Sequence, residues 1–410
     1  MSAPPDAAPL RGKRLSLTLL ALAEVAALSL WFSATAVAPA LRAEFGLSGA
    51  EVARFTSAVQ VGFVAGTLGS AILGLADRIH PVRLFAASVL VAAAANASIL
   101  AIGPDHPAAL AARFLTGVCM AGIYPVGMRI VATWAKGDLG FLVGILVGAL
   151  TLGSALPHLV NTLVALDWRA TMAATSALAV LAAVLCTGVR LGPNYAPAAR
   201  FRAAEALRAW RERPLRLVNI GYLGHMWELY AMWAWIGVFL TESFSARMAP
   251  AEAAALAGLG AFLTIAAGGP GCVVGGWLAD RVGRTRVVMG ALAISGACAL
   301  LAGQLQHAAP WALLALCLVW GAAVVADSPQ FSASAAELAQ PQLVGTMLTV
   351  QTSAGFLLTL ASIQIAPAVA GAVGWGGAFA MLAPGPLAGL VAMARLRADP
   401  ASERLAGGRR

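Results

Sequence analysis

Three acidic side chains lie deep inside apolar stretches of the sequence, namely Glu24, Glu228 and Asp327. A charged side chain at the centre of a bilayer costs roughly 2.5–3.5 kcal/mol on insertion scales. Each acid must therefore be paired, neutralised or exposed to water. A carboxyl group whose surroundings alternate between dry and wet binds a proton in one state and releases it in the other. The three acids therefore have the chemistry of proton carriers that need no cofactor.

The segment around Glu228 is the most unusual one in the chain. His225 lies one helical turn before Glu228 and shares its helix face, and Trp233 and Trp235 follow. We expect Glu228 to carry a coupling proton, with Asp327 as the second carrier and His225 holding or passing on the proton. The alternative is that Glu228 is a structural carboxyl group bonded to a neighbouring helix and that His225 only packs.

Aromatic, amide and basic side chains recur at helical spacing around these acids, which is the usual make-up of a small-molecule site. The residues expected to bind solute are Glu24, Trp31, Arg113, Tyr124, His158, Trp233, Trp235, Trp320 and Gln330. Arg113 is expected to neutralise Glu24 and to keep that acid ionised. His158 forms a polar stripe with Ser154 and Asn161, although a hydrogen-bonded packing histidine is the alternative.

The elements that must position these side chains are helices in a membrane. Of the 410 residues, 60% are apolar and only 11% are charged, against about 25% in soluble domains. This composition excludes an ordinary soluble enzyme. A helix needs about 20 apolar residues to cross the bilayer. Twelve blocks qualify: 15–40, 52–76, 84–103, 108–134, 140–163, 169–190, 215–241, 253–279, 287–305, 310–335, 343–368 and 377–396.

The first block also has the features of a secretory signal peptide, because basic residues precede it and a small-residue triplet, 34–36, lies near its end. Its length is that of a full span, and Glu24 and Trp31 are unusual in a signal peptide. We therefore expect an uncleaved first span.

The basic residues predict the orientation of the chain. With the N-terminus inside, 22 of the 27 basic residues fall on the cytoplasmic side, which places both termini and the central loop in the cytoplasm. The predicted parts are a tail at 1–14, a six-helix bundle at 15–190, a linker at 191–214, a second bundle at 215–396 and a tail at 397–410. The net charge of +9 comes from short runs between apolar blocks, so it indicates anchoring to membrane lipid and no nucleic-acid partner.

The two halves of the sequence repeat each other at an offset of 204 residues. The pairs that share this offset are Glu24 with Glu228, Trp31 with Trp235, Gly117 with Gly321 and Pro125 with Pro329. Parallel repeats of this kind build transporters whose site lies between the halves, near the middle of the membrane.

Two cytoplasmic turns carry related sequences. The turn after the eighth span reads GWLADRVGRTR over 276–286, and the turn after the second span keeps LADR over 75–78. We expect their charged residues to bias a gate between two states; these residues are Asp77, Arg78, Asp280, Arg281 and Arg284. The alternative is a pair of charged turns that only anchor helices to the membrane surface.

These turns, together with Arg113-x-x-x-Gly117, resemble the major facilitator superfamily over nearly the whole chain. The resemblance implies an all-α integral membrane protein whose twelve transmembrane helices form two pseudo-symmetric six-helix bundles. It also implies that spans one, four, seven and ten line a central cavity.

The acids and the resemblance together predict a secondary active transporter. We expect it to move a small polar or organic solute across the inner membrane by alternating access, coupled to protons and working as a monomer. The alternative is a drug/proton antiporter on the same fold, although the span-five signature of such antiporters is missing from 148–157. No nucleotide-binding loop and no catalytic or metal-ligand set is found, so we expect no enzyme activity, no metal and no cofactor.

Overall fold

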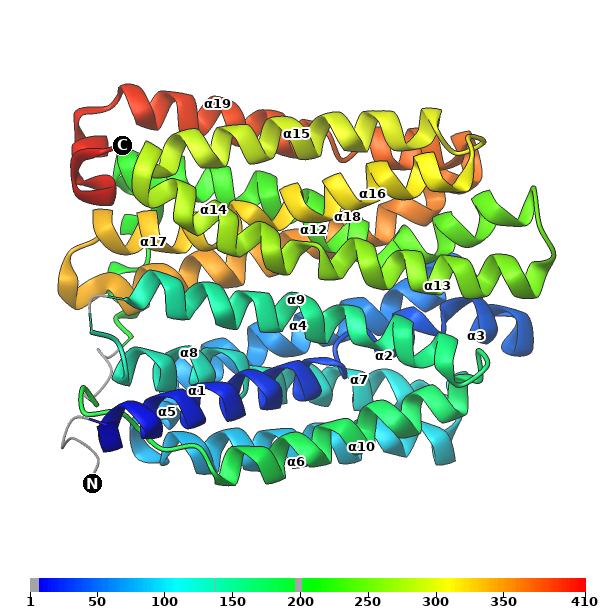
Figure 1. The fold of residues 1–410 in the computed structure, drawn as a ribbon, viewed down its shortest axis with the longest axis horizontal. Helices are drawn as coiled ribbons and strands as arrows, with labels where there is room; N and C mark the ends of the chain where they lie inside the picture. The colour runs from blue at the N-terminus through cyan, green and yellow to red at the C-terminus, as the bar shows by residue number, and fades with distance from the viewer. Residues whose placement is uncertain (1–6, 137, 196–200) are drawn as a thin grey trace.

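The computed structural model describes residues 7–136, 138–195 and 201–410, and helices dominate it (Figure 1). Within these ranges, nine helical stretches are long and apolar enough to cross a membrane. The last stretch, Pro341–Ala398, contains the final two blocks expected from the sequence. The chain is therefore a multi-pass membrane protein, and the helices are consistent with twelve spans.

The described part of the N-terminal half holds ten helices. They are α1 (Ala7–Leu28), α2 (Ser33–Ala36), α3 (Ala38–Phe45), α4 (Gly49–Leu73), α5 (Leu75–Arg78), α6 (Pro81–Ile102), α7 (Pro107–Met120), α8 (Tyr124–Thr133), α9 (Leu139–Leu163) and α10 (Trp168–Thr187). The start of α4 shows why a helix begins where it does. Ser48 and Glu51 form a capping box, in which the Ser48 hydroxyl accepts from the Glu51 amide and the Glu51 carboxylate accepts from the Ser48 amide.

A linker with η1 (Ala203–Glu205) and α11 (Arg208–Arg211) leads to the C-terminal half. That half holds α12 (Arg213–Ser245), α13 (Pro250–Ala266), α14 (Gly268–Val282), α15 (Arg284–Gln304), α16 (Pro310–Ala326), α17 (Ser328–Leu338), η2 (Pro341–Leu343), α18 (Val344–Ala380), α19 (Pro384–Ala398) and η3 (Pro400–Gly408). The long α18 bends at Gly374, whose φ of 79° suits glycine, and this bend separates the last two blocks.

The residue pairs of the sequence repeat have structural roles in both halves. Pro125 and Pro329 lie in the first turns of α8 and α17, where proline fits because the missing N–H would have no partner. Gly117 and Gly321 allow two helices to meet closely. A Cβ atom at Gly117 would lie 2.1 Å from the Val59 carbonyl oxygen, and one at Gly321 would lie 1.7 Å from the Thr264 carbonyl oxygen.

The two halves lie side by side along their length, and the start of α1 and the last residues of the chain lie at one end of the bundle (Figure 1). We call the end that carries the linker the linker face, and the opposite end the far face. Across the boundary between the halves, α4 packs against α18, and α9 packs against α13 and α14. At the linker face, Lys13 of α1 binds Asp138 before α9, with 2.6 Å between Nζ and Oδ2.

The residues after α19 fold back onto the linker face of the C-terminal half. The Ala406 amide donates to a carboxylate oxygen of Glu337 at 3.0 Å, and Arg397 in the last turn of α19 donates to the carbonyl oxygen of Arg410 at 3.3 Å. The Arg409 guanidinium donates to the carbonyl oxygen of Asp280. The tail therefore covers the turn between α14 and α15. The predicted tail at 1–14 and the predicted linker at 191–214 lie partly outside the described residues.

Candidate functional site

Six aromatic rings meet at the boundary between the halves. This aromatic cluster consists of Trp31, Phe32 and Phe63 from the N-terminal half and Tyr230, Trp233 and Phe356 from the C-terminal half. The centroids of Phe63 and Phe356 lie 4.6 Å apart, and those of Phe32 and Trp233 lie 5.8 Å apart. All six side chains are buried. The middle of the molecule is thus closed by rings from both halves.

Polar atoms in and beside the aromatic cluster have no partner within the described part of the chain. The indole nitrogens of Trp31 and Trp233 are buried donors without acceptors, and both amide atoms of Gln60 on α4 are unpartnered. Gln60 lies one turn before Phe63, a member of the cluster. Buried polar groups are normally hydrogen-bonded, and exceptions call for an explanation. These atoms provide donors and an acceptor that a solute between the halves could use.

His225 and Asp327 form a buried pair inside the C-terminal half. Nδ1 of His225 lies 2.9 Å from Oδ1 of Asp327, and each side chain is only 1% exposed. The angles at these atoms do not fit a hydrogen bond, so the two atoms are close without a hydrogen bond between them. The structure thus joins two of the three residues expected to handle protons.

Glu228 is fully buried and points toward α15 and α16. Its Oε1 accepts from the Trp320 indole at 2.7 Å, and its Oε2 accepts from the Ser295 hydroxyl at 2.9 Å. Trp320, expected to bind solute, therefore contacts the acid instead of the aromatic cluster. The two donors leave Glu228 inside its own half, one turn from His225.

Arg113 and Glu24 do not form the expected pair. The Arg113 guanidinium donates to the carbonyl oxygens of Leu30 and Trp31, at 3.0 and 2.7 Å. It also donates to Ser33 and Asn96. The reason is the break between α1 and α2, which leaves carbonyls without helical partners. Both carboxylate oxygens of Glu24 lack a hydrogen-bond partner among the described residues.

The other residues expected to bind solute lie apart from the aromatic cluster. Trp235 donates to the Ile363 carbonyl at 3.0 Å. Gln330 accepts from Arg284 at 2.8 Å, which places it with the linker-face turn. Tyr124, at the start of α8, is half-buried.

The charged turn after α14 is held mainly by Arg284. Its guanidinium makes two hydrogen bonds to Glu337 at the end of α17, at 2.6 and 3.0 Å. Arg281 lies over the Trp277 ring, and the Asp280 side chain is exposed. In the first half Arg78 is exposed, and the side chain of Asp77 lies outside the described part of the structure.

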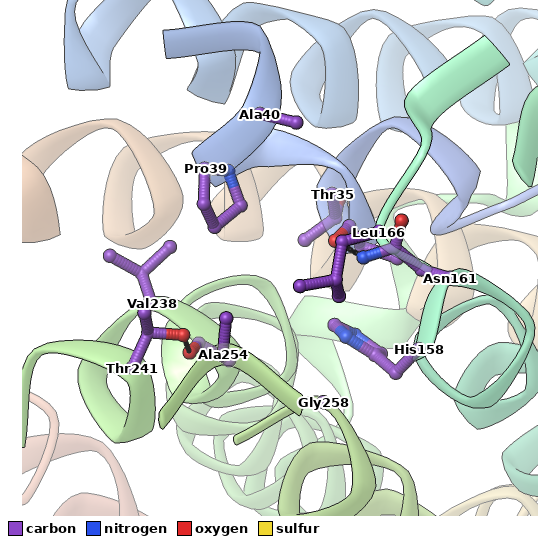
Figure 2. Close-up of a pocket in the computed structure, with 12 residues that line it drawn as sticks. Thr35, Pro39, Ala40, His158, Asn161, Leu166, Val238, Thr241, Ala254 and Gly258 are labelled. Atoms are coloured by element: carbon purple, nitrogen blue, oxygen red, sulfur yellow. Dashed lines mark hydrogen bonds between the residues drawn. The ribbon is translucent and has the colours of Figure 1, made fainter. Parts of the chain in front are cut away.

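Two cavities open between the halves at the far face. The first, which we call the histidine cavity, has a volume of about 210 Å³ and lies between α2, α9, α12 and α13 (Figure 2). Its lining includes Thr35, His158, Asn161 and Thr241. The second, the charged cavity, has a volume of about 280 Å³ and is lined by residues that include Arg42 and Glu242.

Sequence reasoning missed five residues of the central site, which are Gln60, Phe32, Phe63, Tyr230 and Phe356. An amide inside the apolar block 52–76 was the signal that could have identified Gln60. The aromatic residues carry no such signal, because a buried ring in a span is ordinary packing.

A family model described as Major Facilitator Superfamily matches residues 19–363. No curated protein matches the chain. Two solved structures resemble it in fold. One is a bacterial homologue of the human lysosomal transporter Spinster, inward-facing and unoccupied, with 16% identity, a TM-score of 0.67, and 98% of each chain covered. The other is the D323A mutant of the nucleoside transporter NupG, with 13% identity, a TM-score of 0.69, and coverage of 94% of this chain and 99% of that one.

Proposed function

The chain belongs to the major facilitator superfamily, and from that membership we propose that it moves a small polar or organic solute by alternating access, coupled to protons. The linker face is cytoplasmic in this proposal and the far face is periplasmic, because most basic residues lie at the linker face. The membrane is then the inner membrane of the cell.

The observation that carries this proposal is the set of unpartnered polar atoms at the aromatic cluster. Trp31 and Trp233 belong to different halves, and each presents a buried indole N–H with no described acceptor. A solute that accepts from both would bridge the halves. Such a solute would stabilise the closed state in which the halves meet, because a ligand favours the state to which it binds better.

Proton coupling is proposed for the buried acids of the C-terminal half. His225 and Asp327 lie close enough for a proton to pass between them, and Glu228 lies one turn away on α12. The 2.9 Å between Nδ1 of His225 and Oδ1 of Asp327 is a hydrogen-bond distance, so a small rotation of either side chain would let the two atoms share a proton. Movement of α12 against α16 and α17 would change the access of water to these groups and thus their affinity for a proton.

A drug/proton antiporter is the less favoured function. The histidine cavity and the charged cavity, at about 210 and 280 Å³, are smaller than the roughly 300–1,000 Å³ of sites for drug-sized ligands. The middle of the boundary between the halves is filled by the aromatic cluster.

The proposal is tested with Glu228→Gln in vesicles that contain only this protein. Glutamine keeps the shape and accepts hydrogen bonds, but it does not titrate. We expect the variant to lose accumulation of solute driven by a pH gradient while it still exchanges labelled for unlabelled solute. Glu252→Gln, an exposed acid at the far face, is the matched control and should behave as the wild type. Wild-type accumulation by Glu228→Gln would show that this acid is structural.

A further inference from the structure

The histidine cavity has one buried polar atom that nothing in the described structure uses. His158 is 4% exposed, and its Nε2 atom has no hydrogen-bond partner among the described residues. Figure 2 shows its ring extending from α9 beside Asn161 and Leu166, at the wall of the cavity. The nitrogen is enclosed in the cavity wall, so a ligand in the cavity could bond to it once the imidazole ring turns toward the ligand.

The other polar side chains of the cavity already make hydrogen bonds within the protein, but some of them can make one more. The Asn161 amide donates to the Ala36 carbonyl at 3.2 Å and accepts from Thr171 at 2.9 Å, which leaves one N–H free. The Thr241 hydroxyl donates to the Gly237 carbonyl at 2.8 Å and can still accept. The Thr35 hydroxyl is engaged with Thr56. Together with His158 these groups can bind one hydroxyl- or carbonyl-bearing molecule.

Charge decides what kind of molecule fits. No Asp, Glu, Lys or Arg is among the residues that line the histidine cavity, and the remaining lining residues are apolar or glycine. An ion placed there would lose its hydration without gaining a counter-charge, which is costly. No carboxylate lines the cavity to stabilise a protonated His158 either. The charged cavity differs in this respect, because Arg42 and Glu242 line it.

The position of the cavity relates it to the central site. Both halves line it, with Thr35 from α2 on one side and Thr241 from α12 on the other. On α12, Gly237 follows Trp233 by one helical turn, and on the first span Thr35 follows Phe32 by three residues. The cavity therefore lies next to the aromatic cluster, on its far-face side. A molecule in the cavity would lie beside the rings that close the middle of the molecule.

We infer that the histidine cavity is an admission site for an uncharged solute that carries hydroxyl or carbonyl groups and is smaller than a typical drug. This inference rests on the proposed transport function and names the solute class. His158 supplies the contact that holds the solute, and the solute passes to the centre when the aromatic rings of the two halves part.

The selectivity of the cavity can be measured without knowing the solute. The five native cysteines, all buried and free, are replaced, and Ala254→Cys then places one thiol in the histidine cavity. Ala50→Cys places a thiol in the charged cavity and serves as the matched control. Both variants react with neutral methyl methanethiosulfonate and with the cationic and anionic analogues MTSET and MTSES.

For each variant, the rate of reaction with the neutral reagent is divided by the rate with each ionic reagent. We expect this rate ratio to be at least tenfold higher for Ala254→Cys than for Ala50→Cys. Taking this ratio between the two sites removes the intrinsic reactivities of the reagents. Equal preference at the two sites would overturn the inference, because the histidine cavity would then admit ions as readily as the charged one.

Transport assays then separate this inference from the proposed function. The probes are glycerol, glucose and uridine, each compared with a charged counterpart: glycerol phosphate, gluconate and uridine monophosphate. We expect an uncharged probe to be carried, with a KM at least tenfold higher in His158→Phe, a largely unchanged kcat, and partial rescue in His158→Gln. His307→Phe, an exposed histidine outside the cavity, is the control. Transport of charged probes alone overturns the inference but leaves the transporter proposal intact.

Discussion

Arg113 is a buried cation that replaces missing helical hydrogen bonds. The chain unwinds between α1 and α2, and the guanidinium donates to the carbonyl oxygens of Leu30 and Trp31 in that break. Only arginine presents several donors in a fixed planar fork, so a lysine cannot reproduce these contacts. Because Trp31 belongs to the aromatic cluster, Arg113 positions a central ring.

We therefore expect Arg113→Lys to destabilise the protein by about 1–3 kcal/mol, since at least one buried carbonyl loses its donor. Glu24→Gln should have a smaller effect, because no described residue bonds to the Glu24 carboxylate. Thermal unfolding of both variants in the same detergent measures the difference. An equal loss of stability in the two variants would mean that the two side chains depend on each other after all.

At the scale of elements, glycine determines how closely the helices of each half approach. Gly321 on α16 lies against the Thr264 carbonyl of α13, where a Cβ atom would be only 1.7 Å away. Backbone cannot yield as a flexible side chain does, so the helices themselves would have to separate. Gly117 has the same role in the first half, against the Val59 carbonyl.

Gly321→Ala should consequently cost about 1–3 kcal/mol or more, the usual penalty for overfilling a packed interior. Gly290→Ala on α15 is the matched control, because a Cβ there meets nothing within 4 Å. Alanine favours a helix by about 0.5–1 kcal/mol over glycine, so the control should be neutral or more stable. Denaturation midpoints in micelles test this, and a harmless Gly321→Ala would mean that α13 and α16 are free to shift apart.

The salt bridge between Lys13 and Asp138 joins the starts of α1 and α9 at the linker face. The hydrogen bond from Lys13 lowers the pKa of the Asp138 carboxyl below its ordinary value. The contribution of the pair to stability is therefore complete above the unfolded pKa of about 3.9 and is lost as the pH falls through the lower folded value.

Lys13→Met should therefore lower the unfolding temperature at pH 7 and make little difference once the pH has fallen below the lowered folded pKa of Asp138. Asp138 is partly exposed, so the effect at pH 7 should stay below about 1 kcal/mol. Lys136→Met, the only other lysine in the chain, is the control. A difference that persists undiminished in acid would show that Lys13 acts through packing instead.

For the whole molecule, the proposed orientation makes a simple prediction. Leu207→Cys lies in the linker and Ser245→Cys lies at the far end of α12, and both positions are exposed. In intact cells, an impermeant thiol reagent should label Ser245→Cys and spare Leu207→Cys in a cysteine-free background. The reverse pattern would place the linker outside the cytoplasm and the far-face cavities on the cytoplasmic side.

The fold was largely predictable from the sequence because span length and the prolines Pro125 and Pro329 act locally along the chain. The membership in the superfamily and the transporter class are confirmed. The site was less predictable. The sequence puts Glu24 in the first span and Arg113 in the fourth, and the resemblance implies that both spans line a central cavity. Neither reveals that the chain unwinds after α1 and offers its carbonyls to Arg113. The partners of Gln330 and Trp320 likewise depend on helix rotation, which a one-dimensional pattern does not contain.

The fold-back of the chain after α19 has a practical consequence for purification. The carbonyl oxygens of Arg409 and Arg410 occupy the space that a Cβ on Gly283 would need, at 2.3 and 1.8 Å from it. A fusion partner joined after Arg410 would therefore begin where Arg410 packs against Gly283. It would displace the tail from Glu337 and from the turn between α14 and α15. An affinity tag placed there would perturb the very turn that is expected to control the gate, and an inactive preparation would then reflect the tag and not the transporter.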